Sequence, residues 1–266
     1  MSPLGWKKDI DKVPADALLL LEDCHFQWID DNRNRREWAM LFRSRPYIGY
    51  FVRQKSHSKA AWIDGLMMEF GCDPLPDANT LRHMEQKLVA DMEDWIVYVL
   101  EPGTYQRQEF LLWDEKELTD LTTWEGKRVI DIGSGTGKQA FIMAPLCKSV
   151  YCVEPVYNLR RYLKQRAMLE GINNLYVTDG LMKELPFENN FADVITSGHV
   201  FGDFPEAEVH EMLRVAKPGG MVILIPGGKD TDTECHHFLV DKGFSWDRVP
   251  FPAEGFRRKY WKVKQV

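Results

Sequence analysis

The spacing of apolar residues divides the chain into two regions that meet near residue 125. In the first region, up to about residue 100, apolar residues recur at intervals of three and four, which is the period of amphipathic helices. Pro46 is expected to bend or end one of these helices, because its ring cannot continue the helical hydrogen bonding. The stretches with this period are residues 14–31, 34–54, 56–70 and 77–103.

The clearest helical stripe lies in the stretch 77–103. Asp77 or Asn79 can cap its start, and Pro102 with Gly103 is expected to stop it. The stripe consists of Leu81, Met84, Leu88, Met92, Trp95 and Val99.

From Lys127 onward, short β-branched runs alternate with stretches of helical period. Near-continuous apolar runs bounded by glycine suit strands that are covered on both faces. The alternation predicts an α/β fold with a doubly wound, mainly parallel sheet of seven strands. Five runs are predicted to be strands: residues 128–133, 149–155, 174–179, 192–198 and 220–227. Two later runs, 244–251 and 256–266, are expected to form an antiparallel pair at one end of the sheet, joined by a turn with Pro252 and Gly255.

The sequence thus predicts a helical N-terminal domain over residues 1–104, a linker over 105–125 and an α/β domain over 126–266. The chain has 266 residues, 44% of them hydrophobic, and a net charge of −6, as expected of a folded protein without a general nucleic-acid-binding surface. Its five cysteines are irregularly spaced and predict reduced core residues. An early apolar run ends after five residues, far short of the roughly 20 that span a bilayer, and no leader pattern precedes it. A cytoplasmic protein without membrane contact is expected.

The stretch "VIDIGSGTGKQA", residues 129–140, contains three glycines at alternate positions followed by Lys138. A magnesium-dependent phosphate loop needs a glycine where Ile132 stands and a hydroxyl residue where Gln139 stands, so that type is excluded. A dinucleotide loop needs a third glycine at the position of Lys138. Two interpretations stay open at this point: a tight turn without a ligand, or a loop for another nucleoside.

With its acid two positions before the first glycine, "VIDIGSGTG" resembles the first motif of the class I S-adenosylmethionine-dependent methyltransferases. The resemblance continues through strand ends with acids at 154 and 179 and through "EMLRVAKPGGMVILIP", and it covers about residues 126–228. It implies S-adenosyl-L-methionine as cofactor, with the glycines beside the amino-acid part and Asp131 holding its ammonium group. Glu154 is expected to accept bonds from the ribose hydroxyls and Asp179 from the adenine amino group. The complete cofactor set that is implied is Asp131, Gly133, Ser134, Gly135, Glu154, Asp179, Gly180 and Ser197.

The end of the fourth strand decides which chemistry is possible, because ligands bind at that edge of such sheets. His199 is the candidate catalytic base, since an imidazole can accept a proton near neutral pH, or it only shapes the pocket. Asp203 can orient that ring or bind a polar substrate. The linker adds Tyr105 and Arg107 as candidate substrate contacts, with Trp113 as a further aromatic group. No metal site is expected at "ECHH", residues 234–237, because adjacent helical residues point in different directions.

These residues favour methyl transfer to oxygen, nitrogen or sulfur of a small molecule, with the N-terminal helices as a lid over the cofactor edge. An Asn/Asp-Pro-Pro-aromatic motif is absent, which makes nucleic-acid or protein-glutamine acceptors less favoured. The chain is expected to be a monomer or homodimer. Two alternatives stay open: a macromolecular acceptor such as RNA or protein, or a non-catalytic partner subunit that binds the cofactor. An RNA acceptor would use a basic face built from Arg33, Arg35, Arg36, Arg43 and Arg45.

Overall fold

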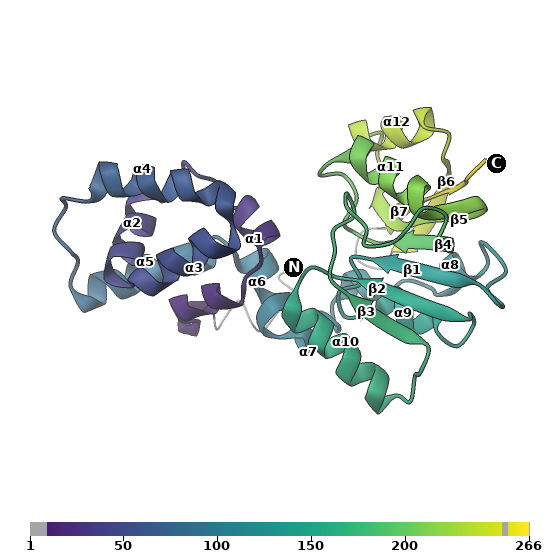
Figure 1. Ribbon diagram of the computed structural model, residues 1–266, viewed down its shortest axis with the longest axis horizontal. Coiled ribbons are helices and arrows are strands. Elements are labelled where there is room, and N and C mark those ends of the chain that lie inside the picture. Colours follow the sequence, from purple (N-terminus) through teal and green to yellow (C-terminus); the bar gives the residue numbers. More distant parts are fainter. Residues whose placement is uncertain (1–9, 252–254, 266) are drawn as a thin grey trace. The chain divides into compact units, whose positions relative to one another are not determined.

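The chain forms two compact units that divide between Thr104 and Tyr105 (Figure 1). The computed structural model describes residues 10–251 and 255–265, so the predicted turn residue Pro252 lies outside the described part. None of the helices in these two ranges is long and apolar enough to cross a membrane.

The N-terminal unit is helical, as the apolar period predicts, but its helices are shorter than expected. Pro46 divides the second stretch as predicted, because α2 ends at Ser44 and the proline opens α3. The stretch 14–31 is not one helix, since the extended backbone of Leu21 separates a 3₁₀ segment from α1. The elements are 3₁₀ turns at Ile10–Lys12, Ala15–Leu20 and His57–Lys59 and helices α1 Asp23–Gln27, α2 Arg35–Ser44, α3 Pro46–Lys55, α4 Ala60–Phe70, α5 Ala78–Ala90 and α6 Glu93–Leu100.

The stripe predicted over 77–103 runs across two helices, α5 and α6. Asp77 caps α5, and one of its carboxylate oxygens accepts from the amides of Asn79 and Thr80 at 2.9 Å each. The helical stretch is interrupted at Asp91–Met92, between α5 and α6, and α6 ends at Leu100. Pro102 follows the end of α6 and is also the first residue of the short helix α7, Pro102–Tyr105. Proline suits this position because the first helical residue needs no backbone N–H.

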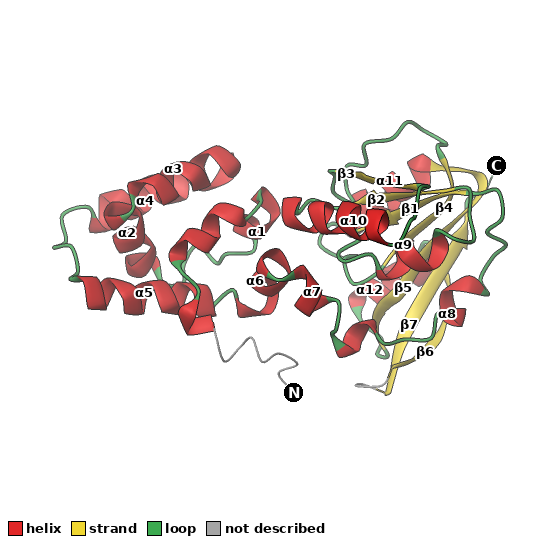
Figure 2. Cartoon of the chain, turned by 90° about the horizontal axis from the view of Figure 1, so that it is seen from below, coloured by secondary structure: helices red, strands yellow, loops and turns green. Residues whose placement is uncertain are grey.

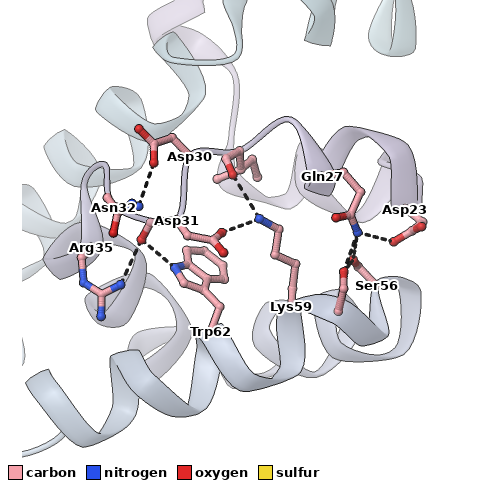
Figure 3. A network of polar contacts seen from close by, with 11 residues as sticks. Asp23, Gln27, Asp30, Asp31, Asn32, Arg35, Ser56, Lys59 and Trp62 are labelled. Atoms are coloured by element: carbon pink, nitrogen blue, oxygen red, sulfur yellow. Dashed lines mark hydrogen bonds and ion pairs between the residues drawn. The ribbon is translucent and has the colours of Figure 1, made fainter. Parts of the chain in front are cut away.

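A buried lysine fastens the loop before α2 to α4 (Figure 3). Lys59 is 5% exposed, forms an ion pair with Asp31, and donates to the Ile29 carbonyl at 3.0 Å. Trp62 donates from its indole nitrogen to the Asp31 carbonyl, also at 3.0 Å. A buried ammonium group needs such partners because its desolvation is costly, so Lys59 organises this loop.

Replacing Lys59 with methionine is expected to lower the free energy of unfolding by about 1–3 kcal/mol, because the Ile29 carbonyl loses its donor. Lys87→Met is the matched control, since Lys87 pairs with Glu37 at the surface with 54% of its side chain exposed. Its loss is expected to stay below about 1 kcal/mol. Urea titration of both variants measures the difference, and equal losses would contradict an organising role for Lys59.

The second unit holds a seven-stranded sheet in the order β3-β2-β1-β4-β5-β7-β6. The first five strands in this order are parallel, and β7 runs antiparallel to both of its neighbours. The α/β fold, the five parallel strands and the antiparallel pair at one end are therefore confirmed. The strands are β1 Arg128–Ile132, β2 Ser149–Val153, β3 Leu175–Thr178, β4 Ala192–Ser197, β5 Ala216–Lys229, β6 Ser245–Phe251 and β7 Gly255–Val263.

Helices cover both faces of this sheet (Figure 2). On one face Ile130 and Ile132 pack with α11, Pro205–Val215, and α12, Glu234–Asp241. On the other face Val129 packs with residues of three helices, α8 Lys116–Thr119, α9 Lys138–Met143 and α10 Tyr157–Leu169. Side chains alternate along a strand, so Asp131 shares the face of Val129 and places a carboxyl group in this apolar layer.

Candidate functional site

The site is built where β1 ends between β2 and β4, the point at which the strand order reverses. The loop there turns through left-handed backbone at all three glycines, with φ of 65° at Gly133, 54° at Gly135 and 92° at Gly137. A Cβ at Gly137 would lie 2.5 Å from Cδ2 of Phe141, and one at Gly133 would lie 2.7 Å from a methyl group of Val200. Packing therefore requires the outer two glycines.

The middle glycine has a different environment. A Cβ on Gly135 would meet the Tyr105 ring at 3.5 Å and the Gly133 carbonyl oxygen at 4.0 Å, both ordinary contact distances, so this part of the backbone has room beside it. That space is a pocket that opens to solvent, with an empty volume of about 390 Å³ when the open solvent is included. It is lined by Tyr105, Leu111, Trp113, Asp131, Gly133, Ser134, Gly135, Thr136, Lys138, Gln139, Gly198, His199 and Pro226.

Asp131 is the buried charged group of this pocket. It is 2% exposed, and one carboxylate oxygen accepts from the Thr196 hydroxyl at 3.3 Å. The other oxygen, Oδ2, has no hydrogen-bond partner among the described residues. Burial raises the pKa of Asp131 to about 7. An orphaned carboxylate oxygen beside a pocket is suited to accept from a bound ammonium group.

Glu154, which directly follows β2, ties the glycine loop to that strand. Its two oxygens accept from the backbone amides of Gly135 at 2.8 Å and Val156 at 2.9 Å. The side chain is buried, which raises its pKa to about 7. Each carboxylate oxygen keeps a second lone pair, so Glu154 can still accept from ligand hydroxyl groups.

Asp179 follows β3 and is joined to Glu154 through Arg160 of α10. The guanidinium contacts a carboxylate oxygen of Asp179 at 3.1 Å and donates to the Glu154 carbonyl at 2.7 Å. The Asp179 side chain is 70% exposed. Gly180 packs closely, since a Cβ there would lie 2.8 Å from a Val153 methyl group. Both acids therefore lie at one edge of the sheet, outside the lining of the pocket.

His199 lines the pocket from the segment after β4. Its backbone is left-handed, with φ of 65°, and its amide donates to the Pro226 carbonyl at 3.3 Å. The exposed imidazole stands edge-on to Phe110, with 5.1 Å between ring centroids, and Nδ1 lies 3.4 Å from a guanidinium nitrogen of Arg257. The ring is thus held from two sides.

The remaining predicted residues fall into two groups. Tyr105 lines the pocket, where burial raises the pKa of its phenol. Ser197 is buried beside it on β4, but its hydroxyl donates to the Ile132 carbonyl at 3.0 Å and is not part of the lining. Arg107 and Asp203 are exposed and also lie outside the lining, so the pocket does not gather them with His199.

Residues in and around the site that were not predicted from the sequence include Gln139, Glu208 and Arg257. Gln139 lines the pocket, donates to the Ile225 carbonyl, and has its own carbonyl oxygen without a partner among the described residues. Glu208 is buried on α11 and accepts from the amide of Gly202 at 2.8 Å, which holds the turn before that helix. Arg257 comes from β7, 58 residues after His199. Gln139 had a signal in the sequence through its position next to the glycine loop, and Arg257 through the basic cluster at residues 257–259.

Of the residues of "ECHH", His236 packs into the interior, whereas Glu234 and His237 are exposed. His236 is buried, and its Nδ1 lies 3.1 Å from the hydroxyl of Tyr260. Within residues 10–251 and 255–265 no group of three or more potential ligands converges on a metal position.

Comparison with known proteins adds a family likeness for this unit. Residues 130–224 match a family model described as "Methyltransferase domain". A demethylmenaquinone methyltransferase of Geobacillus kaustophilus is 29% identical over 126 residues, which are 46% of this chain and 54% of the relative. A protein-L-isoaspartate O-methyltransferase of Dictyoglomus turgidum is 31% identical over 106 residues, which are 39% of this chain and 46% of the relative. The chain thus spans about half the length of the curated relatives it matches.

The solved structures share the fold of the second unit. A crystal structure of a SAM-dependent methyltransferase from Aquifex aeolicus superposes with a TM-score of 0.50 at 18% identity. The superposition covers 62% of this chain and 98% of that chain.

Proposed function

We propose that this chain, whose residues 130–224 match a family model described as "Methyltransferase domain", is a class I S-adenosylmethionine-dependent methyltransferase that transfers the methyl group of that cofactor to oxygen, nitrogen or sulfur of a small molecule. The observation that carries the proposal is the orphaned oxygen of Asp131 beside the glycine loop, in a pocket that also presents His199. Relatives named for a quinone precursor and for a protein residue leave the acceptor open, so its size is inferred from this chain alone.

The acceptor groups of the site fit the cofactor part by part. Asp131 can accept from the ammonium group of the methionine part, and the backbone at Gly135 leaves room for it. Glu154 can accept from both ribose hydroxyls with its remaining lone pairs. Asp179 and Gly180, at the end of β3, are suited to the adenine ring. The arrangement needs no phosphate-binding group, in agreement with a loop that lacks the residues for magnesium or pyrophosphate.

Methyl transfer from a sulfonium is an in-line displacement whose donor is already activated. The protein therefore contributes chiefly by aligning the acceptor and excluding water. The aromatic groups of the pocket wall, Tyr105 and Trp113, supply apolar surface for that purpose and can contact a sulfonium favourably. His199 holds the polar position in front of the acceptor.

The arginines of the N-terminal unit argue against a nucleic-acid acceptor. Each of the five candidates already has a partner within the unit, so phosphates would have to compete with carboxylates or carbonyls. Arg43 donates to the Phe70 carbonyl at 2.9 Å. The ion pairs are Arg33–Asp91 at 2.6 Å, Arg35–Glu69 at 2.7 Å, Arg36–Asp73 at 3.0 Å and Arg45–Glu85 at 2.6 Å.

Incubation of the protein with methyl-labelled cofactor and fractionated cell extract tests the proposal. Label is expected in the small-molecule fraction after ultrafiltration, and this transfer is expected to fall at least tenfold in Glu154→Ala, which weakens cofactor binding. Label that stays with retained RNA or protein after the filter has been washed would favour the macromolecular alternative. Cofactor binding without transfer to any fraction would favour the non-catalytic partner.

A further inference from the structure

We propose that Arg257 fixes His199 as a hydrogen-bond donor, so that the site takes an acceptor presenting an anionic oxygen, such as a carboxylate, phosphate or enolate. The proposal rests on the methyltransferase function proposed above. It assigns Arg257 as a positioning residue and replaces the role of His199 as a base.

The geometry starts from the contact between the two side chains. A terminal nitrogen of Arg257 lies 3.4 Å from Nδ1 of His199, and the same guanidinium lies over the Phe251 ring, 4.7 Å from its centroid. The imidazole stands edge-on to Phe251 at 6.4 Å and to Phe110 at 5.1 Å. Both partners thus rest on the same aromatic surface, which limits how far either can turn away.

The direction of this hydrogen bond follows from the chemistry of arginine. A guanidinium group has only donors, so Nδ1 of His199 must be the acceptor. A neutral imidazole whose Nδ1 accepts carries its proton on Nε2. The opposite tautomer would direct its Nδ1–H at the guanidinium, and the doubly protonated ring would add a second positive charge beside it. Arg257 therefore disfavours both states that a base at Nε2 would pass through.

With its proton on Nε2, His199 offers a hydrogen-bond donor. The group that complements it is an electron-rich oxygen, and a charged acceptor makes the stronger bond. Lys138 and Tyr105 also line the pocket and carry donors, Lys138 lying 3.5 Å from a carboxylate oxygen of Glu115, whereas Asp131 lies on the cofactor side in the proposed arrangement. An acceptor that is already anionic needs no base to remove a proton before methyl transfer.

The tautomer can be measured without knowing the acceptor. In ¹⁵N-histidine-labelled protein saturated with S-adenosylhomocysteine, two-dimensional NMR is expected to show His199 with a protonated Nε2 and a bare Nδ1. Arg257→Ala is expected to convert this signal to a mixture of tautomers, and Arg257→Lys, which keeps a cationic donor, is expected to restore it. A proton on Nδ1 in the unmodified protein would overturn the proposal while leaving the methyltransferase function intact.

Benzoate and its neutral isostere benzamide serve as probes of the acceptor class. Benzoate is expected to move the His199 Nε2 signal in a saturable way, with an affinity at least tenfold above that for benzamide, and Arg257→Ala is expected to remove this preference. Equal affinity for the two probes, or no saturable shift with either, would contradict an anionic acceptor.

Once an acceptor has been found, two amide variants distinguish a hydrogen-bond donor role of His199 from a role as base. Glutamine places an N–H near the position of Nε2, whereas asparagine reaches only that of Nδ1 and tolerates the left-handed backbone of residue 199. His199→Gln is expected to keep kcat within about tenfold, and His199→Asn is expected to lose about 100-fold. Equal losses in both variants would restore the role of a base.

Discussion

Replacing Glu154 with alanine is expected to weaken S-adenosylhomocysteine binding on the order of 100-fold, because two hydrogen bonds from ribose hydroxyls to a buried carboxylate are lost together. Glu154 is 4% exposed and also accepts from the amide of Gly135 at 2.8 Å, so the change loosens the glycine loop as well. Isothermal titration calorimetry measures the affinity. Glu170→Ala is the matched control, since Glu170, which directly follows α10, forms an exposed i,i+4 pair with Arg166.

The effect on the loop must be separated from the effect on the ribose. The 2′-deoxy analogue of S-adenosylhomocysteine lacks one of the two hydroxyls, so the unmodified protein is expected to bind it about tenfold more weakly. Glu154→Ala is expected to bind both ligands equally, because the partner of that hydroxyl is already gone. A tenfold preference that persists in the variant would place the ribose elsewhere, and the double-mutant cycle gives the coupling directly.

Cofactor affinity is expected to rise with pH and to level off above about pH 7. Burial raises the pKa of both Asp131 and Glu154 to about 7, so the cofactor-free protein holds these carboxyl groups protonated below that pH. An ammonium group binds only the ionised Asp131, so each required deprotonation lowers affinity tenfold per pH unit below about 7. Between pH 5.5 and 6.5 the slope is expected to lie between one and two.

Asp131→Asn removes one of these two protons and leaves the shape of the side chain. It is expected to lower affinity about 100-fold at pH 8 and to reduce the slope by about one. Calorimetry in two buffers with different ionisation enthalpies counts the protons released on binding. A pH-independent affinity in the unmodified protein, or an unchanged slope in the variant, would contradict the proposed contact between Asp131 and the ammonium group.

The same two carboxyl groups act on stability in the opposite direction. Their pKa is higher in the folded protein than in the unfolded chain, so the folded state binds more protons between about pH 4 and 7. The cofactor-free protein is therefore expected to lose stability as pH rises through this window, and thermal unfolding at pH 5 and 7.5 measures it. Saturating cofactor is expected to reduce the loss, because binding favours the ionised form.

The parallel sheet could be predicted from the sequence because buried strands leave a strong local signal. Runs such as residues 128–133 are apolar, β-branched and bounded by glycine, and each became a strand at the predicted place. The helical region was less readable, since apolar spacing does not show where a helix breaks. Helices end at Leu21 and at Asp91–Met92 although the apolar period continues across both positions. The break at Pro46 was predictable, because its ring cannot continue the helical hydrogen bonding.

The candidate site divides in the same way. The glycine loop and the acids at 131, 154 and 179 could be proposed from the sequence, because the motif that resembles the methyltransferases occupies one turn and three neighbouring strand ends. Three features of the site needed the folded chain: Oδ2 of Asp131 has no partner among the described residues, Glu154 holds the glycine loop, and Arg257 contacts His199. The last contact joins residues 58 positions apart through an antiparallel strand, and a pairing between distant segments leaves no periodic trace in either of them.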